Sequence, residues 1–414
     1  MSKGGYRVGS RYNELHISPI MIDLVHRAHD VGLIGMRLGS EDAGRITRIW
    51  PEIPLIAMYQ DAVFFVHDIV SHPDRETIVL SRCRDRRELP TASSRHLEYK
   101  DTPEIAAMRE QVQRYNSLID RTFVDIPTLD YPRILRPSRA SNELDSYVWL
   151  DQNNKYSRRI FYRGDWALGG RFHGGFWQQL PEYYRSQLYL NDLPVVEDDY
   201  RGTHIALLYG MEGRPLREDP YSLNMASEYS ALQMRKWVKS LVLIAINARS
   251  ETSSFNAFRQ GEPTGSPAKR FTNAQLKLLL EEFKRQHPAI ANYLCSDKGV
   301  ELMAIDGRIT ARIIDQFTKD SIPVLTVFDS YLIAGKYASD LRSAMKVAMD
   351  REVPGASTNY DRAGVPFEYA TAHTDQITGM RTMHPADRNR EPMTLGYLSR
   401  LHAFRSRQLH RGRS

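Results

Sequence analysis

Two aspartates that follow apolar segments are the residues of this chain best suited to catalysis. Asp199 ends the segment Leu193-Pro-Val-Val-Glu-Asp-Asp199, and Asp329 lies at a predicted tight turn inside Val324-Leu-Thr-Val-Phe-Asp329-Ser-Tyr-Leu-Ile333. A buried carboxylate is costly unless it is paired, solvated or bound to a metal. Two of them brought together repel unless a divalent cation lies between them, and Mg²⁺ favours few carboxylates, water and substrate phosphates. The alternative is that each Asp simply caps a turn.

A pair of cations lies between these aspartates in the sequence. Arg235 and Lys239 are one turn apart on a helix predicted over residues 225–248, so both project from one face. Two like charges on one face weaken a helix unless an anion is bound there. A triphosphate is one such anion, and a solvated surface is the alternative.

A glycine-rich segment precedes both features. It reads Gly169-Gly-Arg171-Phe-His-Gly-Gly-Phe-Trp-Gln178-Gln-Leu-Pro181, and Arg185 follows it. Glycines beside Arg, Gln and aromatic residues suit a backbone that closely approaches a sugar–phosphate chain. The alternative is a glycine-rich turn with a core Trp.

In order and local sequence, these segments resemble the polymerase core of the DNA polymerase I family (family A). Gly170-Arg171 with Phe176-Trp-Gln-Gln-Leu-Pro181 is similar to the TGR and NLQNIP segments of that family. Asp199-Tyr-Arg-Gly-Thr-His204-Ile-Ala stands in the place of motif A, DYSQIELR. Arg235 and Lys239 match the cations of motif B, and Val327-Phe-Asp-Ser330 matches motif C, VHDE. The resemblance covers roughly residues 160–350.

The resemblance implies nucleotidyl transfer with two Mg²⁺ ions, for which Mn²⁺ would substitute. Asp199 and Asp329 would hold the metals, with the backbone carbonyl of Tyr200 as a further ligand. The Tyr200 ring would lie under the incoming sugar, and Arg185 would be either a duplex contact or a core ion pair. The implied nucleotide-binding residues are Arg235, Lys239, Tyr200, His204, Leu243 and Asn247. The implied DNA-binding residues are Arg171, Gln178, Arg185, Phe328 and Ser330.

Several positions depart from the family pattern. His204 replaces the Glu that helps to exclude ribonucleotides, and Leu243 and Asn247 stand where the fingers helix carries aromatic residues. Phe328 and Ser330 replace the His and Glu of motif C. The aspartates and the cations are retained, so the transfer reaction itself is still expected.

The implied fold is α+β, a right-hand polymerase with palm, fingers and thumb and a winged-helix-like N-terminal region. The expected division is residues 1–95 for that N-terminal region, 96–144 for a thumb-like helical segment, 145–224 and 300–385 for the palm, 225–299 for the fingers, and 386–414 for a basic, mobile tail. The expected elements are helices over 102–123, 299–318 and 338–350, a helix starting at Thr272 with Gln275 in a capping box, a strand–turn–strand over 322–333, and loops over 126–141 and 250–270.

The N-terminal region predicts the order helix, strand, turn, strand, helix over residues 10–80. Arg45, Arg48 and Trp50 lie on its second strand, which would be the wing of a winged helix. A small α+β packing domain is an equally good interpretation.

Composition favours an anionic partner. The chain has 414 residues and a net charge of +6, and nucleic acid is the first candidate because arginine grips phosphate with two hydrogen bonds. Only Cys83 and Cys295 occur, which argues against a disulfide scaffold or a structural zinc site. No apolar run is long enough to span a bilayer, so we expect no membrane and a cytoplasmic location, in the host if the protein is phage-encoded.

Three functional hypotheses follow. The first is a template-directed DNA polymerase, in phage or plasmid replication or repair, with primer–template DNA and deoxynucleoside triphosphates as partners and any replication proteins unspecified. The second is an RNA-synthesising or primase-like polymerase, suggested by His204. The third is a non-catalytic DNA-binding replication protein, suggested by Arg45, Arg48 and the C-terminal arginines Arg400, Arg405, Arg407, Arg411 and Arg413.

Overall fold

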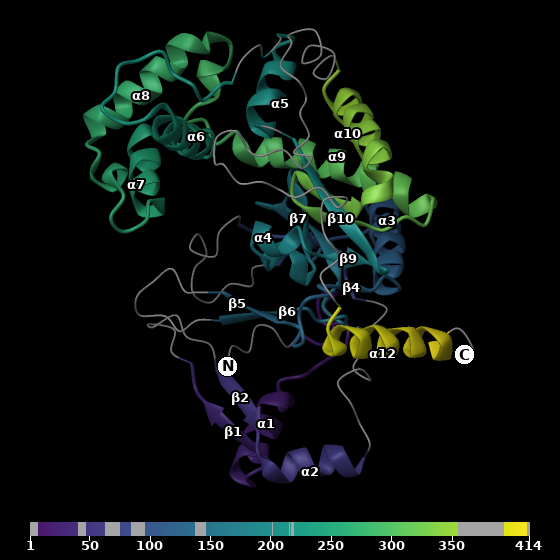
Figure 1. The fold of residues 1–414 in the computed structure, drawn as a ribbon. Helices are drawn as coiled ribbons and strands as arrows, with labels where there is room; N and C mark the ends of the chain where they lie inside the picture. The colour runs from purple at the N-terminus through teal and green to yellow at the C-terminus, as the bar shows by residue number, and fades with distance from the viewer. Residues whose placement is uncertain are drawn as a thin grey trace. The chain divides into compact units, whose positions relative to one another are not determined.

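The computed structural model separates into two units, residues Met1–Glu110 and Gln111–Ser414. It describes residues 7–39, 47–62, 75–83, 96–136, 146–200, 202–214, 216, 219–354 and 393–411. Figure 1 shows the elements of both units. Helix α3 (Pro103–Asp120) spans the boundary between them.

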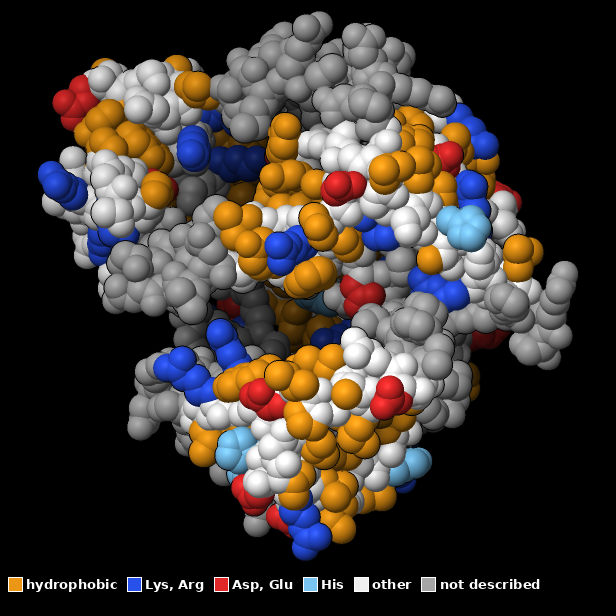
Figure 2. Space-filling view, turned by 60° about the horizontal axis from the view of Figure 1, so that its bottom comes forward, with side chains coloured by type: hydrophobic (Ala, Val, Ile, Leu, Met, Phe, Trp, Pro, Cys, Tyr) orange, Lys and Arg blue, Asp and Glu red, His pale blue; other side chains and the backbone are white. Residues whose placement is uncertain are grey.

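The first unit has the predicted order of helix, strand, strand, helix. Its elements are α1 (Ile20–Asp30), β1 (Ile34–Arg37), β2 (Arg48–Pro51), α2 (Ile53–Asp61) and β3 (Ile78–Leu80). Strands β1 and β2 are antiparallel, all of β2 is exposed, and no residue of α1 or α2 is buried. Hydrophobic side chains therefore gather on the surface of this unit (Figure 2). The winged helix stays a prediction, and Arg45 lies outside the described residues.

The second unit is built around a five-stranded sheet of order β11-β12-β10-β9-β4. The strands are β4 (Val124–Asp125), β9 (Tyr189–Leu190), β10 (Leu193–Asp199), β11 (Val324–Val327) and β12 (Ser330–Ala334), and neighbouring strands are antiparallel. The β11–β12 hairpin confirms the strand–turn–strand predicted over residues 322–333. Most side chains of β12 are buried, as in a central strand.

A second pair of strands lies against the long helix α9 (Gly299–Lys319). These are β7 (Ser157–Tyr162) and β8 (Asp165–Gly174), and α9 packs on β8. Gly307 makes the close approach possible, because a Cβ atom there would lie 2.3 Å from the carbonyl oxygen of Gly170. Helix α10 (Ala338–Glu352) runs along α9 (Figure 1).

A separate group of helices contains α6 (Ala231–Asn247), α7 (Glu251–Gly261) and α8 (Asn273–Gln286), as Figure 1 shows. The predicted capping box of Thr272 and Gln275 at the start of α8 is confirmed. The loop predicted over residues 250–270 is wrong, because α7 occupies most of it. Ser250 and Ser253 form a second capping box, and Phe255 and Phe258 bury its apolar face.

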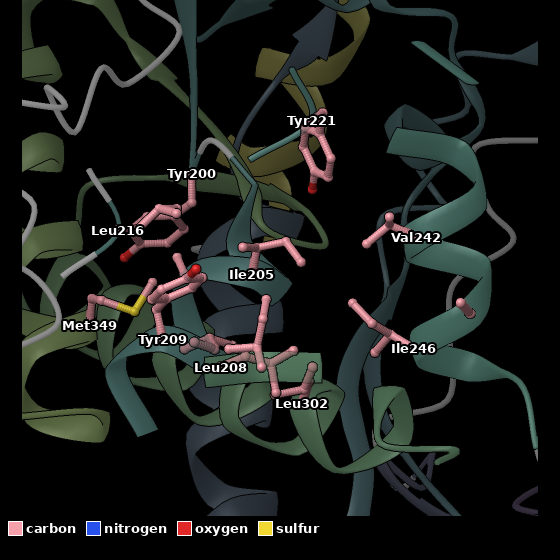
Figure 3. Packing of buried hydrophobic residues seen from close by; sticks show 14 of the residues in the cluster. Tyr200, Ile205, Leu208, Tyr209, Leu216, Tyr221, Val242, Ile246, Leu302 and Met349 are labelled. Carbon is pink, nitrogen blue, oxygen red and sulfur yellow. The ribbon is translucent and has the colours of Figure 1, made fainter. Parts of the chain in front are cut away.

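Apolar side chains from α5 (Thr203–Met211), α6 and α9 meet in one large core (Figure 3). Ile205 and Leu208 on α5, Ile246 on α6 and Leu302 on α9 are all fully buried. Helix α5 therefore joins the end of β10 to the helical group.

Within the segment predicted as a mobile tail, residues Leu395–Arg411 instead form an ordered helix, α12. Tyr397 and Phe404 pack against Phe123, and Arg400 donates two hydrogen bonds to the fully buried carboxylate of Asp125, at 2.7 and 3.2 Å. Aromatic contacts and a buried ion pair dock this helix on the second unit. Its arginine-rich composition had suggested a mobile segment.

Among the described residues of the segment predicted as thumb-like (96–136), the helix is α3. It continues into β4 and then into β5 (Arg133–Arg136), which pairs with β6 (Ser146–Trp149) in a two-stranded ribbon. Strand β5 lies inside the loop predicted over residues 126–141, so that prediction is wrong. Pro132 immediately precedes β5, a position where a missing N–H is tolerated. The short helix α4 (Glu182–Arg185) lies between β8 and β9 in the sequence.

The contact at Gly307 gives a test of the packing of α9 on β8. Gly307→Ala should lower the free energy of unfolding by roughly 1–3 kcal/mol, because the new methyl group forces backbone apart. Urea denaturation measures the change. Gly261→Ala is the matched control, since a Cβ atom there meets nothing within 4 Å. Equal stability of Gly307→Ala and the wild type would contradict the close packing.

Candidate active site

Asp199 and Asp329 come together at one end of the five-stranded sheet. Asp199 is the last residue of β10, and in the antiparallel register it lies opposite Ser330, the residue after Asp329. Burial, followed by the negative charges of Asp329 and Glu197, raises the pKa of Asp199 to about 6. Carboxylates that disfavour each other's ionised form create an environment that attracts a cation.

The turn that presents Asp329 has an unusual backbone. Phe328 has a φ of +58°, in the left-handed region that bulky residues rarely adopt. Its ring packs edge-on against His173, with centroids 5.6 Å apart, and lies 5.5 Å from the guanidinium carbon of Arg171. Thr203 at the start of α5 donates from Oγ1 to Oδ2 of Asp329 at 2.6 Å. These contacts fix the turn and the carboxylate together.

Arg171 is held inside the protein rather than presented to a duplex. Its Nε donates to Oδ2 of Asp306, which is fully buried on α9. Burial raises the pKa of Asp306 to about 6, while the charge of Arg171 opposes that shift. Nη2 of Arg171 lies 3.2 Å from Nε2 of His204. A guanidinium only donates, so in this contact Arg171 is the donor and Nε2 of His204 the acceptor.

Arg185 forms the core ion pair that the sequence offered as one of two possibilities. Its Nε lies 3.0 Å from both carboxylate oxygens of Glu197, and its Nη2 lies 2.8 Å from Oε1. Ser330 Oγ donates to the same Oε1 at 2.6 Å. Two predicted DNA contacts therefore hold Glu197, which shares one face of β10 with Asp199.

Gln178 also satisfies its side chain within the fold instead of facing a duplex. Its amide nitrogen donates to the carbonyls of Phe172 and Thr326, at 3.2 and 3.0 Å, and its oxygen accepts from the N–H of Gly174 at 3.0 Å. The residue fastens a one-turn 3-10 helix (Phe176–Gln179) to strand β11. Its contacts indicate a structural role.

The Tyr200 ring belongs to the hydrophobic core, and the prediction that it lies under a nucleotide sugar does not hold in this structure. It is 2 % exposed, its hydroxyl donates to the carbonyl of Met345 at 2.6 Å, and the core of Figure 3 surrounds it. The backbone carbonyl of Tyr200 lies 3.0 Å from Thr203 Oγ1, close to the carboxylate pair. Only the main-chain part of the prediction for Tyr200 remains open.

The two cations of α6 differ in their surroundings. Lys239 is exposed, and its charge lowers the pKa of Asp199, so it acts on the carboxylate pair. Arg235 instead forms an ion pair with Asp219, with Nη2 3.2 Å from Oδ1. Both cations lie over the ring of Tyr221, at 6.0 Å for Lys239 and 5.7 Å for Arg235. Of these two cations, Lys239 is therefore the better placed to bind an anionic ligand.

The other two residues predicted to bind nucleotide lie further along α6. Asn247 donates to the carbonyl of Leu243 at 2.8 Å, and its side chain meets Gly299 at the start of α9. Leu243 is half-buried. Their contacts are those of helix packing, and a role in nucleotide binding stays a prediction.

Sequence reasoning missed three residues of this site, namely Glu197, Thr203 and Asp306. The alternation of β10 places Glu197 on the face of Asp199, and this signal was available. Asp306 lies next to the apolar Ile305 in the helix predicted over residues 299–318, and a carboxyl group buried there requires a partner. Thr203 could not have been found, because its role depends on the register that brings Asp329 to the start of α5.

Magnesium stays a prediction at this site, which would offer a metal few protein ligands. Over the residues that the structure describes, no three or more His, Cys, Asp and Glu side chains form a group that could hold a metal. Two carboxylates and a main-chain carbonyl leave the other coordination positions to water and phosphate, which is the environment that Mg²⁺ prefers.

Comparisons with known proteins provide little further information. No protein-family model and no curated protein matches this chain. Among solved structures, a similar one is the POL domain of Pol1 from M. smegmatis in complex with DNA primer-template and dNTP, at 9 % identity and a TM-score of 0.31. The match covers 46 % of this chain and 44 % of that one, too limited to define the fold. Among the described helices, none has the length and apolar character needed to cross a membrane.

The raised pKa of Asp199 predicts that replacing this carboxylate with a neutral side chain stabilises the protein, and that the size of the effect depends on pH. The folded value of about 6 exceeds the ordinary 3.8, so the folded state binds more protons and stability falls as pH rises between these values. Asp199→Asn should therefore raise the free energy of unfolding by on the order of 1–2 kcal/mol above pH 7, and the gain should vanish near pH 4. Urea denaturation at both pH values measures it.

Asp320→Asn is the control, because Asp320 is an exposed aspartate at the end of α9. Its effect should be small at both pH values. A destabilised Asp199→Asn at pH 8 would show that the carboxylates do not oppose each other.

Proposed function

We propose that this chain is a template-directed DNA polymerase that adds deoxynucleotides to a primer 3′ end. The observation that carries the proposal is the meeting of Asp199 and Asp329 at one end of a sheet, with the charge of Lys239 on α6 acting on Asp199. The order of the sequence segments that resemble family A polymerases supports the same reaction. In this proposal the palm is residues 145–224 and 300–385, and the fingers are residues 225–299.

Asp199, Asp329 and the carbonyl of Tyr200 would hold two Mg²⁺ ions, and Mn²⁺ would substitute. When bound, the metal pair supplies a lowered pKa for the primer 3′-hydroxyl and neutralises charge on the triphosphate. The chain's own contribution is to hold these ligands in place. Thr203 fixes one oxygen of Asp329, and the pairing of β10 with β12 fixes the spacing of the two carboxylates.

Lys239 would supply positive charge where the leaving phosphates become more negative as the bond to the α-phosphate breaks. It is exposed, and its charge acts on Asp199. Arg235 contributes less, because Asp219 already neutralises it. The phosphate site therefore depends chiefly on one lysine.

A second candidate is synthesis of RNA, which one observation favours. His204 stands where the family carries the Glu that helps to exclude ribonucleotides, and its ring is in contact with Arg171. Extension of one primer–template with deoxyribonucleotides and with ribonucleotides in parallel decides between the two.

The non-catalytic alternative loses part of its basis. Arg400, one of the arginines that suggested it, is bound to Asp125 within the fold. A non-catalytic DNA-binding protein would bind duplex DNA with a steep salt dependence and show no metal-dependent extension.

Primer extension with Mg²⁺ tests the proposal. Asp199→Asn and Asp329→Asn should each reduce the rate by at least about 10³-fold, since the loss of one preorganised electrostatic group already costs about 10²–10³-fold. Circular dichroism should show an intact fold in both variants. Asp320→Asn should extend the primer like the wild type. Full activity in either site variant, or none in the wild type on any template, would refute the proposal.

A further inference from the structure

The β5–β6 ribbon carries an exposed aromatic face with a cation at its centre. Arg133 pairs with Trp149 and Leu135 with Tyr147, so these four side chains share one face. Leu135, Tyr147 and Trp149 are 46 %, 49 % and 52 % exposed. Tyr131, just before the strand, is 74 % exposed. We call this set (Tyr131, Arg133, Leu135, Tyr147 and Trp149) the aromatic ribbon face.

The opposite face of the ribbon explains how the aromatic ribbon face is presented. Ile134 and Val148 pair with each other there and are only 2 % and 4 % exposed. Strand β6 also lies against the 3-10 helix that Gln178 fastens to β11. The ribbon is therefore anchored from one side to the same unit as Asp329, and its outward face is a fixed surface.

Arg133 organises the rings on this face. Its guanidinium carbon lies 4.6 Å from the ring centroid of Tyr147, 5.7 Å from that of Trp149 and 6.0 Å from that of Tyr131. Within the described residues, no carboxylate is paired with Arg133. Arg136 at the end of β5 is also exposed.

We propose that the aromatic ribbon face binds single-stranded nucleic acid. Flat rings that are fixed and exposed offer stacking platforms for unpaired bases, which every base can use whatever the sequence. A guanidinium among the rings adds stacking and an attraction for the phosphate chain. A single strand uses both features of this face, since its bases stack on the rings and its phosphates attract the arginine.

The site stands apart from the proposed reaction, although an unpaired template strand is the occupant that a polymerase would provide. It needs neither Mg²⁺ nor nucleotide. Binding is therefore measured in EDTA, where failure of the ribbon site and failure of the proposed polymerase are distinguishable.

The experiment measures fluorescence anisotropy of a labelled 20-residue oligothymidine with the full chain. Trp149→Ala and Tyr147→Ala should each weaken binding by about tenfold, as expected for loss of one stacking platform, while Trp149→Phe and Tyr147→Phe should restore most of it. Arg133→Gln should weaken binding and reduce the slope of log Kd against log salt by about 0.7. Leu278→Ala on α8, which removes an exposed side chain (60 %), is the matched surface control.

Several outcomes would overturn the proposal. One is equal affinity of the wild type and both alanine variants for oligothymidine with unchanged thermal stability. Another is a wild type that binds blunt duplex as tightly as the single strand, with both affinities unchanged by Trp149→Ala. A third is self-association that Trp149→Ala abolishes while oligothymidine binding stays the same, which would assign the face to a second copy of the chain. Binding that depends on the ribbon in a chain without extension activity supports the ribbon site and removes the polymerase.

Discussion

Repulsion between two carboxylates at the end of one sheet is the interaction on which the rest of this structure depends. Asp199 ends β10 and Asp329 lies in the turn before the neighbouring strand β12, and burial together with the charge of Asp329 raises the pKa of Asp199. Such an arrangement is unfavourable for the free protein. In the proposed function, a cation bound between the two carboxylates would recover this cost.

The surrounding elements are explained by the need to hold those two groups still. The left-handed Phe328 turns the β11–β12 hairpin, Thr203 fixes the carboxylate that it presents, and Glu197 is held by Arg185 and Ser330. Beneath them, Arg171 ties β8 to Asp306 on α9, where Gly307 allows helix and strand to touch. Polar residues that resemble DNA contacts in the sequence thus form the support for the site. Lys239 is the exposed cation of the site. The aromatic ribbon face is a separate exposed surface on the same unit.

Elements of the fold could be predicted where they depend on residues close together in the sequence. Helix α9, the β11–β12 hairpin and the capping box at Thr272 are set by periodicity and caps within a few residues, and the sequence predicts them. Helix α7 was missed because serine and glycine suggested a loop, although Phe255 and Phe258 provide an apolar face. Helix α12 depends on Asp125, which is 275 residues away from Arg400 in the sequence. The convergence of Asp199 with Asp329 was expected from their places at strand ends, whereas the partners of Arg171, Arg185 and Gln178 depend on the tertiary fold.

Anomalous diffraction from crystals of the chain grown with Mn²⁺, primer–template DNA and an unreactive deoxynucleoside triphosphate analogue tests the central claim most directly. The account predicts two manganese peaks, about 3.5–4 Å apart, with carboxylate oxygens of both Asp199 and Asp329 as ligands. Peaks bound to one aspartate alone, or bound elsewhere on the chain with both aspartates unliganded, would contradict it.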